Sequence, residues 1–119
     1  MKGLLLVAHG SRRKESNEEI IKLTAQIEQI ADNEFDIVSG AFLQYASPDI
    51  NEQIESYVKK GVTEITVFPY FIAAGNHVVV DIPEIVGNFR KKYPQIRIEL
   101  TKHLGSFMEI AEFIVDKVK

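Results

Sequence analysis

The apolar run from Gly3 to Ala8 constrains the fold of this chain more than any other segment. The run is continuous rather than alternating, and such runs form strands that are buried on both faces of a parallel sheet. Neighbouring parallel strands must be joined by a long crossover, which is usually a helix. The rest of the sequence is therefore expected to alternate helices with strands.

Strand and helix patterns do alternate, within a length that predicts one domain over residues 1–119. After a turn at Gly10, apolar residues recur at helical spacing and predict a helix from about Lys14 to Ala31. Further strands are expected at Phe35–Leu43, Thr63–Phe68 and Ile96–Thr101, and the segment Tyr70–Val80 is expected to be an irregular loop.

Several residues mark where the later helices begin and end. Ser47 is expected to cap the second helix, with Pro48 at its first position and Gly61 in a left-handed conformation at its end. Asp81 is expected to cap the third helix, with Glu84 three residues on. The last helix, Ser106–Val118, is expected to bury a stripe formed by Phe107, Ala111, Ile114 and Val118.

This pattern predicts an α/β fold, a three-layer sandwich around a four-stranded parallel sheet. Right-handed crossovers favour the strand order 2-1-3-4, a flavodoxin-like sheet with the first and second helices on opposite faces. The strand order then reverses between strands 1 and 3. Open α/β sheets bind ligands at the carboxyl ends of the strands beside such a switch point.

Two histidines are expected at that point. His9 follows the first strand directly, and His77 follows the third strand after the irregular loop. Alone, His9 could be a local turn residue and His77 a core histidine bonded to a carbonyl, but their common edge favours a functional pair. Neutral imidazole binds transition metals and accepts protons, and the chain has no cysteine. The pair predicts chemistry on a metal ion, or proton transfer beside one.

The turn after His9 adds candidate ligand-binding residues. Gly10 permits a sharp turn or a close ligand approach, and the N–H groups around Ser11 could bind a carboxylate. The basic residues Arg12, Arg13 and Lys14 are most often just a solvated first turn, but their positive charge at a helix start opposes the helix dipole, which fits a site where an anionic ligand compensates. Gln44 follows the second strand and could hydrogen-bond a ligand, although an ordinary loop role is slightly favoured.

An apolar strip surrounds the second histidine. Phe71 and Ile72 precede it, Gly75 allows the chain to turn, and Val78–Val80 follow. If exposed, the strip would suit a flat apolar ligand or a subunit interface. His103 follows the fourth strand, beyond the switch point, and is expected to lie in a solvated loop without function.

Composition excludes several classes of function. The formal charge of −3 disfavours nucleic acid as a partner, because nothing attracts a polyanion. The first ten residues, MKGLLLVAHG, contain too short an apolar run for a signal peptide or a membrane span. A cytoplasmic location without membrane contact is expected.

Six short motifs, in order along nearly the whole chain, resemble those of the CbiX/SirB sirohydrochlorin chelatases. They are His9–Arg12, Ala41–Leu43 with Pro48 shortly after, Phe68–Phe71, Gly75–His77, Asp81–Pro83 and Leu104–Gly105. The histidine–glycine turn alone is a weak signal. The block that runs from Pro69 through the glycine and histidine to Pro83 is specific.

The resemblance implies an ATP-independent chelatase that inserts a divalent metal into sirohydrochlorin, with the metal as substrate and without an organic cofactor. Cobalt is the expected metal, with iron or nickel as alternatives. The products would feed cobalamin, sirohaem or a nickel tetrapyrrole. His9 and His77 match the family histidines implicated in metal binding and proton abstraction.

The resemblance also bears on the substrate and on assembly. The length is that of the short family form, which implies a homodimer with the tetrapyrrole between its halves. Candidate substrate contacts are Gly10, Ser11, Arg12, Gln44, Phe71, Gly75 and Val78. The residue after Ala41–Leu43 is often glutamate in relatives, so Gln44 puts a carboxylate contribution at that position in doubt.

Two other functions fit parts of the pattern. A carrier on the same fold would bind metal and tetrapyrrole without accelerating insertion, because a fold does not fix a function. A histidine phosphatase would place its nucleophile in an Arg-His-Gly turn after the first strand. Here Ala8 takes the arginine position and removes the phosphate clamp, which disfavours that class.

Overall fold

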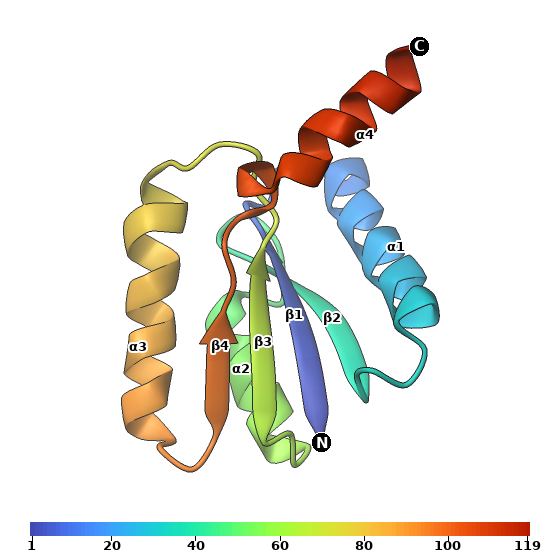
Figure 1. The fold of residues 1–119 in the computed structure, drawn as a ribbon. Coiled ribbons are helices and arrows are strands. Elements are labelled where there is room, and N and C mark those ends of the chain that lie inside the picture. Colours follow the sequence, from blue (N-terminus) through green and yellow to red (C-terminus); the bar gives the residue numbers. More distant parts are fainter.

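A computed structural model describes residues 1–119 as an α/β fold built on one parallel sheet (Figure 1). The strand order is β2-β1-β3-β4, as predicted. The strands are β1 (Lys2–Ala8), β2 (Ile37–Phe42), β3 (Glu64–Pro69) and β4 (Arg97–Leu100). The second strand is shorter at both ends than the predicted Phe35–Leu43.

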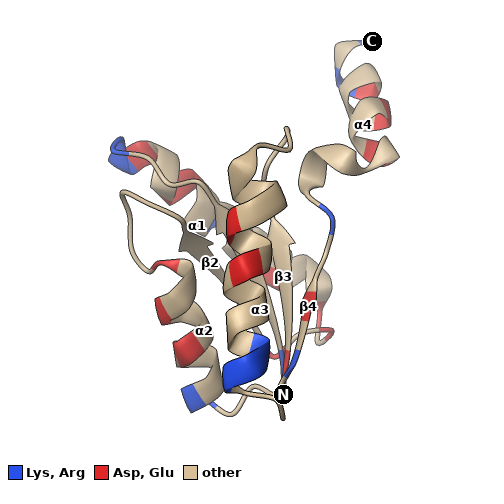
Figure 2. Ribbon diagram, turned by 90° about the vertical axis from the view of Figure 1, so that its left-hand side faces the viewer, with Lys and Arg blue, Asp and Glu red and all other residues tan.

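Helices lie on both faces of this sheet, which confirms the predicted layers. They are α1 (Lys14–Ala31), α2 (Ile50–Lys59), α3 (Ile82–Lys92) and α4 (Met108–Val118), with a π-helical turn at His77–Asp81 and a 3-10 turn at Leu104–Ser106. Figure 2 shows α2 and α3 side by side on one face. None of the helices combines the length and the apolar character needed to cross a membrane.

The core lies between the sheet and the layer formed by α2 and α3. Alternate residues of the strands point into it and meet the apolar stripes of the two helices. Its members are Leu5, Val7, Ala41, Ile50, Ile54, Tyr57, Val62, Ile65, Val67, Ile82, Val86, Phe89, Ile96 and Ile98. The hydroxyl of Tyr57, which is fully buried, donates a hydrogen bond of 2.7 Å to the Leu4 carbonyl.

A charged contact at the surface also joins α2 and α3. Lys92 and the Tyr93 hydroxyl each lie 2.9 Å from an oxygen of Glu55. These hydrogen bonds, that of Lys92 first, hold the pKa of the Glu55 carboxyl below its ordinary value. The contact ties the carboxyl-terminal end of α3 to its neighbour.

The start of α2 differs from the prediction. Asp49, rather than Ser47, is the N-cap, and it forms a capping box with Glu52. The Pro48 carbonyl accepts a hydrogen bond from the Phe42 N–H, so the residues before Asp49 lie beside the end of β2 and are not part of the helix. The helix ends at Lys59, and Gly61, two residues on, has a φ of +89°, which fits the left-handed conformation predicted for it.

The last helix also differs from the prediction. Figure 1 shows α4 extending beyond the carboxyl edge of the sheet, away from the other layers. None of its residues is buried, and Val118 is 76% exposed. Phe107, just before the helix, is half-buried because its ring stacks on that of Phe68, but Ala111, Ile114 and Val118, the rest of the predicted stripe, are exposed.

Replacing Tyr57 with phenylalanine is expected to lower the free energy of unfolding at neutral pH by about 1 kcal/mol, because a buried hydrogen bond is lost. Burial raises the pKa of the Tyr57 hydroxyl to about 12. The folded state therefore opposes its ionisation, and the wild type loses stability as the pH rises from about 10 towards 12. The variant has no hydroxyl to ionise and lacks this loss. The difference in unfolding free energy between the wild type and the variant should therefore narrow by about 1 kcal/mol near pH 11.

Urea unfolding at both pH values measures this difference. Tyr45→Phe is the matched control, because Tyr45 is 53% exposed. A gap that stays constant between the two pH values would contradict the assigned role of Tyr57.

Candidate functional site

The two histidines meet at the carboxyl edge of the sheet. β1 and β3 are neighbours, His9 follows β1 directly, and His77 opens the π-helical turn that leads into α3. The ring centroids are 4.9 Å apart, at an interplanar angle of 67°. The predicted convergence of the two side chains is thus confirmed, and the irregular loop before His77 is shorter than predicted.

Contacts on both ring nitrogens define the tautomer of His9. Its Nδ1 lies 3.0 Å from the Gly10 carbonyl, so Nδ1 is the donor. Its Nε2 lies 2.8 Å from the Gln44 side-chain nitrogen and accepts from that amide. Gln44 is therefore a direct partner of the histidine rather than an ordinary loop residue, and it covers the lone pair that a metal would use.

His77 is oriented by a carboxylate. Its Nδ1 donates to Asp81 across 2.8 Å, which leaves the Nε2 lone pair for a metal or a proton. A carboxylate partner fixes the tautomer and the ring orientation of a ligating imidazole. The side chains of both residues are partly exposed, so the pair is open to solvent.

The role of Asp81 corrects the sequence analysis, which assigned it to helix capping. Its side chain makes no capping hydrogen bond. The π-helical turn already supplies a partner at this point, because the Ile82 N–H donates to the His77 carbonyl. The spacing of four residues between His77 and Asp81 is the signal in the sequence that could have indicated this contact, because residues four apart on a helix lie on the same face.

The separation of the rings fits a metal shared by two imidazoles. With metal–nitrogen bonds of about 2.1 Å, a metal would lie roughly 3.3 Å from each centroid. Bond angles of about 90–110° then place the centroids roughly 4.7–5.4 Å apart, close to the observed distance. No cluster of three or more potential metal ligands is present. The two imidazoles could therefore supply only part of a coordination shell, which would suit a metal that is held briefly.

Gly10 allows the turn after His9 to lie close to the loop that contains Gln44. Its φ is +90°, and a Cβ atom there would collide with the Gln44 carbonyl oxygen. The Gln44 N–H in turn donates to the His9 carbonyl across 3.1 Å. The two loops can approach this closely only because residue 10 has no side chain.

The N–H groups expected to receive an anion are partly occupied. The Ser11 N–H donates to the Asn17 side chain, and the Arg13 N–H donates to the Ser11 hydroxyl. The Arg12 guanidinium lies 4.7 Å from the centroid of the Tyr45 ring, over its face. Arg12 is exposed and is the better candidate for contact with an anionic ligand on this side.

The apolar surface near His77 differs in composition from the predicted strip. Phe71 packs against the core, and the Gly75 carbonyl accepts hydrogen bonds from the N–H groups of Val78 and Val79. Val78 is half-buried in the turn that follows. The side chains that remain exposed are Ile72 (68%), Val79 (62%) and Val80 (50%).

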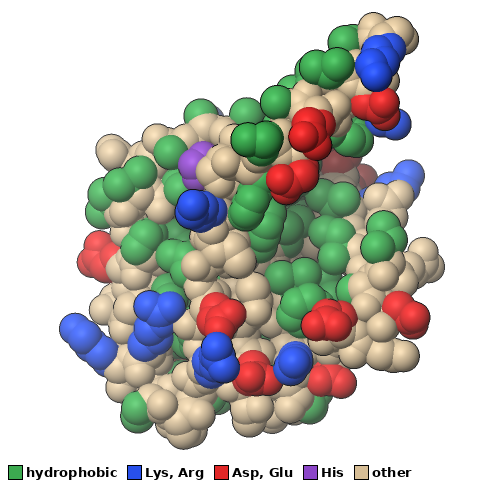
Figure 3. Space-filling view, in the orientation of Figure 1, with side chains coloured by type: hydrophobic (Ala, Val, Ile, Leu, Met, Phe, Trp, Pro, Cys, Tyr) green, Lys and Arg blue, Asp and Glu red, His purple; other side chains and the backbone are tan.

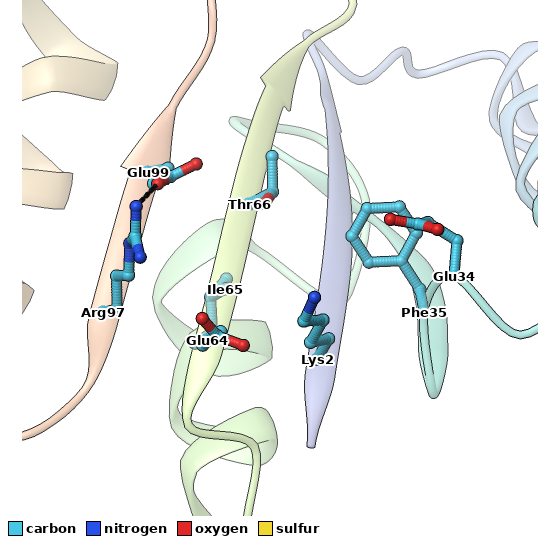
Figure 4. Close-up of a pocket in the computed structure, with 8 residues that line it drawn as sticks. All are labelled: Lys2, Glu34, Phe35, Glu64, Ile65, Thr66, Arg97 and Glu99. Atoms are coloured by element: carbon cyan, nitrogen blue, oxygen red, sulfur yellow. Dashed lines mark ion pairs between the residues drawn. The ribbon is translucent and has the colours of Figure 1, made fainter.

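Two hollows lie on different parts of the surface. One, of about 350 Å³, is lined by Leu43, His77, Asp81, Glu84, Ile85 and Asn88 and reaches the second histidine. The other, of about 250 Å³, lies at the amino end of the sheet beside Lys2, Glu64 and Arg97, far along the strands from the histidines (Figure 4). His103 follows β4 and uses its backbone carbonyl to accept from Ser106. The arrangement with metal-binding chemistry is therefore the one at the carboxyl edge.

Known proteins are similar to this chain in sequence and in fold. The family model of CbiX matches residues 3–119. A sirohydrochlorin cobaltochelatase of Saccharolobus solfataricus is 32% identical over 99% of this chain and 94% of its own length. The chloroplastic sirohydrochlorin ferrochelatase of Arabidopsis thaliana is 29% identical over 98% of this chain and 51% of its length. The chain thus spans about half of that relative.

A solved structure agrees with these relatives. The sirohydrochlorin chelatase SirB of Bacillus subtilis subspecies spizizenii, in complex with cobalt, superposes with a TM-score of 0.84 and 29% identity. The match covers 98% of this chain and 49% of that one. The fold and the site define a class of protein, a parallel α/β domain with paired imidazoles at the switch point of its sheet. The chain belongs to the CbiX family.

Replacing Gly10 with alanine is expected to destabilise the fold more than the same change at Gly61. Both glycines have φ near +90°, so each alanine meets a backbone penalty of about 1–2 kcal/mol. A side chain at Gly61 enters open space, whereas one at Gly10 strikes Gln44. Chemical unfolding of the two variants should show an additional loss of about 1–3 kcal/mol at Gly10. Equal losses would mean that the loop beside Gln44 yields freely.

Proposed function

We propose that this chain inserts a divalent metal into sirohydrochlorin without ATP. The observation that carries the proposal is the His9–His77 pair, with centroids 4.9 Å apart, in a chain of the CbiX family. Relatives named for chelation of sirohydrochlorin support the substrate. We take cobalt as the preferred metal, with iron and nickel as alternatives.

The metal would be held by the Nε2 atoms of the two histidines. For that, the Gln44 amide must leave His9, since it occupies the same lone pair. Asp81 would keep the His77 ring in place while its Nε2 binds. Nitrogen ligands without thiolates hold a borderline metal less tightly, which favours transfer to the tetrapyrrole.

Insertion also requires a path for protons. The metal replaces the two inner pyrrole N–H protons of the macrocycle, so those protons must leave as the metal–nitrogen bonds form. An imidazole whose Nε2 has released the metal can accept one of them as a general base. His77 is the better placed acceptor, because its Nδ1 is held by Asp81 and its Nε2 has no partner to displace, whereas Nε2 of His9 accepts from Gln44.

Substrate binding would use both sides of the histidine pair. Sirohydrochlorin carries carboxylates around an apolar macrocycle, and Arg12 is an exposed cation beside the turn at Gly10 and Ser11. The exposed apolar side chains of Ile72 and Val79 offer contact with the face of the ring. Of the predicted contacts, Phe71 and Val78 are half-buried and would support this surface from within, and the exposed Gly75 would lie beside it.

Two copies of the chain would enclose the macrocycle in a homodimer. The histidine pair is open to solvent, and a single edge can cover only one face of a flat ligand. A second copy would supply the other face and exclude water. The physiological metal would depend on its supply, because imidazole sites accept cobalt, nickel and iron alike.

A carrier role is the alternative, since the same two imidazoles could bind metal without promoting transfer. An absorbance time course with sirohydrochlorin and Co²⁺ separates the two functions. We expect conversion faster than the uncatalysed reaction, and a loss of about 100-fold or more in His9→Ala and in His77→Ala. His103→Ala is the matched control and should retain activity. A wild-type rate equal to the blank with Co²⁺, Fe²⁺ and Ni²⁺ would establish the carrier role.

Asp81→Asn tests the positioning of His77. We expect the affinity for Co²⁺ to fall by about 10–100-fold, the usual effect of losing a partner of a ligating histidine. The unfolding midpoint should hardly change, because Asp81 caps no helix. Glu84→Gln, on the next turn of α3, is the control for a lost carboxylate. Equal effects of the two substitutions in a metal titration would exclude a specific role for Asp81.

A further inference from the structure

Tyr45 has a backbone conformation that an aromatic residue rarely adopts. The residues other than glycine with a positive φ are Asp32 (38°), Asn33 (69°) and Tyr45 (65°). Asp32 and Asn33 follow α1, and their short polar side chains tolerate the left-handed conformation. Tyr45 is bulky and follows a strand rather than a helix, so its backbone is strained. Strain of this kind persists where surrounding contacts impose it, and it occurs mainly at functional sites.

Contacts on both sides of Tyr45 impose this conformation. The preceding residue, Gln44, is bonded to His9 twice, by its N–H to the carbonyl across 3.1 Å and by its side-chain amide to Nε2 across 2.8 Å. Beyond Tyr45, the Pro48 carbonyl accepts a hydrogen bond of 3.0 Å from the Phe42 N–H and closes the loop. Tyr45 lies between these two connections, so its φ can relax only if one of them opens.

Burial does not explain where the Tyr45 ring lies. The residue is exposed and does not belong to the apolar core. Its ring contacts the guanidinium of Arg12 instead, whose central carbon lies 4.7 Å from the ring centroid, over the face of the ring. Such a contact between a cation and an aromatic face is attractive. The strained loop thus places an aromatic face against a cation.

Arg12 is a cation without a carboxylate partner. The guanidinium of the neighbouring Arg13 lies 3.5 Å from the Glu15 carboxylate, whereas none of the salt bridges includes Arg12. In Figure 3 the visible face carries apolar side chains beneath α4 and charged ones along its lower edge, at the amino end of the sheet. An anionic ligand at the carboxyl edge therefore depends on the basic residues after His9, of which Arg12 is unpaired.

The contact with Tyr45 leaves the hydrogen-bond donors of Arg12 available. The five N–H groups of a guanidinium lie in its plane, so a ring that covers one face leaves the donor edge open. A carboxylate pairs with that edge through two parallel hydrogen bonds. Because the ring also restricts the rotation of a long, exposed side chain, less conformational entropy is lost when the anion binds.

We propose that Tyr45 is a positioning residue, which holds the Arg12 guanidinium ready to receive a carboxylate of the substrate. The ligand class is a flat aromatic molecule with carboxylates around its rim. A relaxed φ at Tyr45 would turn the ring away from Arg12, which accounts for the strained conformation. The application to sirohydrochlorin rests on the proposed function, whereas the recognition of a carboxylate by Arg12 rests on the geometry.

The position of Tyr45 in the chain links two parts of the site. Gln44 and Tyr45 are consecutive, so one short loop contacts both Nε2 of His9 and the guanidinium of Arg12. A rim carboxylate bound at Arg12 would therefore lie beside the loop that contacts the first histidine.

Equilibrium binding of metal-free ligands tests the positioning role without catalysis. The probes are sirohydrochlorin and mellitate, a benzene ring with a carboxylate on every carbon atom, each titrated calorimetrically into the full chain. Tyr45→Asn removes the ring but accepts a left-handed backbone, and we expect it to weaken both probes by about three- to tenfold. Tyr45→Phe is the conservative variant and should bind like the wild type. Arg12→Gln should weaken both probes by about tenfold or more.

A double variant shows whether Tyr45 acts through Arg12. In the Arg12→Gln background, Tyr45→Asn should change the affinity by less than about twofold, because the cation that it positions is absent. Urea unfolding of Tyr45→Asn should show no loss of stability, since asparagine tolerates the left-handed conformation. Additive effects of the two substitutions on affinity, or wild-type affinity in Tyr45→Asn, would overturn the proposal.

The insertion assay with Co²⁺ separates this inference from the proposed function. Tyr45→Asn should raise KM for sirohydrochlorin by the same factor and leave kcat unchanged, because it removes binding and no step of the chemistry. Mellitate binding that depends on Tyr45 and Arg12, without any metal insertion, would refute only the proposed function. Insertion by the wild type with unaltered binding in the Tyr45→Asn variant would refute only the positioning role. A chain that binds neither probe would overturn the positioning role as well.

Discussion

The pairing of β1 with both β2 and β3 is the constraint on which the rest of the structure depends. The residues of β1 are buried on both faces of the sheet, so this strand can lie only in the interior of the sheet. Parallel pairing then brings the ends of β1, β2 and β3 to the same edge. His9, Gln44 and the loop that leads to His77 meet there because each follows one of these three strands.

Most of the fold could be predicted because its signals are local or periodic. A continuous apolar run indicated the central strand, helical spacing indicated α1 to α3, and the handedness of crossovers gave the strand order. That order predicted His9 and His77 at the same edge of the sheet, but the reach of His77 depended on the loop between β3 and the π-helical turn. The prediction of Ser47 as the N-cap of α2 was wrong because the Pro48 carbonyl accepts a hydrogen bond from Phe42 in β2. No sequence pattern around Ser47 reveals that tertiary contact.

Features that depend on competing partners could not be predicted. Asp81 had two possible partners, a helix end and an imidazole, and a π-helical turn decided between them. In the turn at Ser11, the Ser11 N–H donates to the Asn17 side chain and the Arg13 N–H donates to the Ser11 hydroxyl. These two N–H groups are therefore not free to bind an anion. For α4 the periodicity was read correctly, yet an apolar stripe does not state which surface covers it. The contacts of Gly105 and Phe107 hold the start of α4 beside the carboxyl edge of the sheet, and the stripe beyond them is left exposed.

The side-chain amide of Gln44 blocks one ring nitrogen of the site, Nε2 of His9. The hydrogen bond from Gln44 covers Nε2 of His9, and Gly10 allows the two loops to lie close together in that arrangement. Under the proposed function, an incoming ion would have to displace this neutral, tethered competitor, and the same competitor would return when the ion departs. Under the proposed function, such a site resets itself after each turnover. The chain would then pass metal on rather than store it.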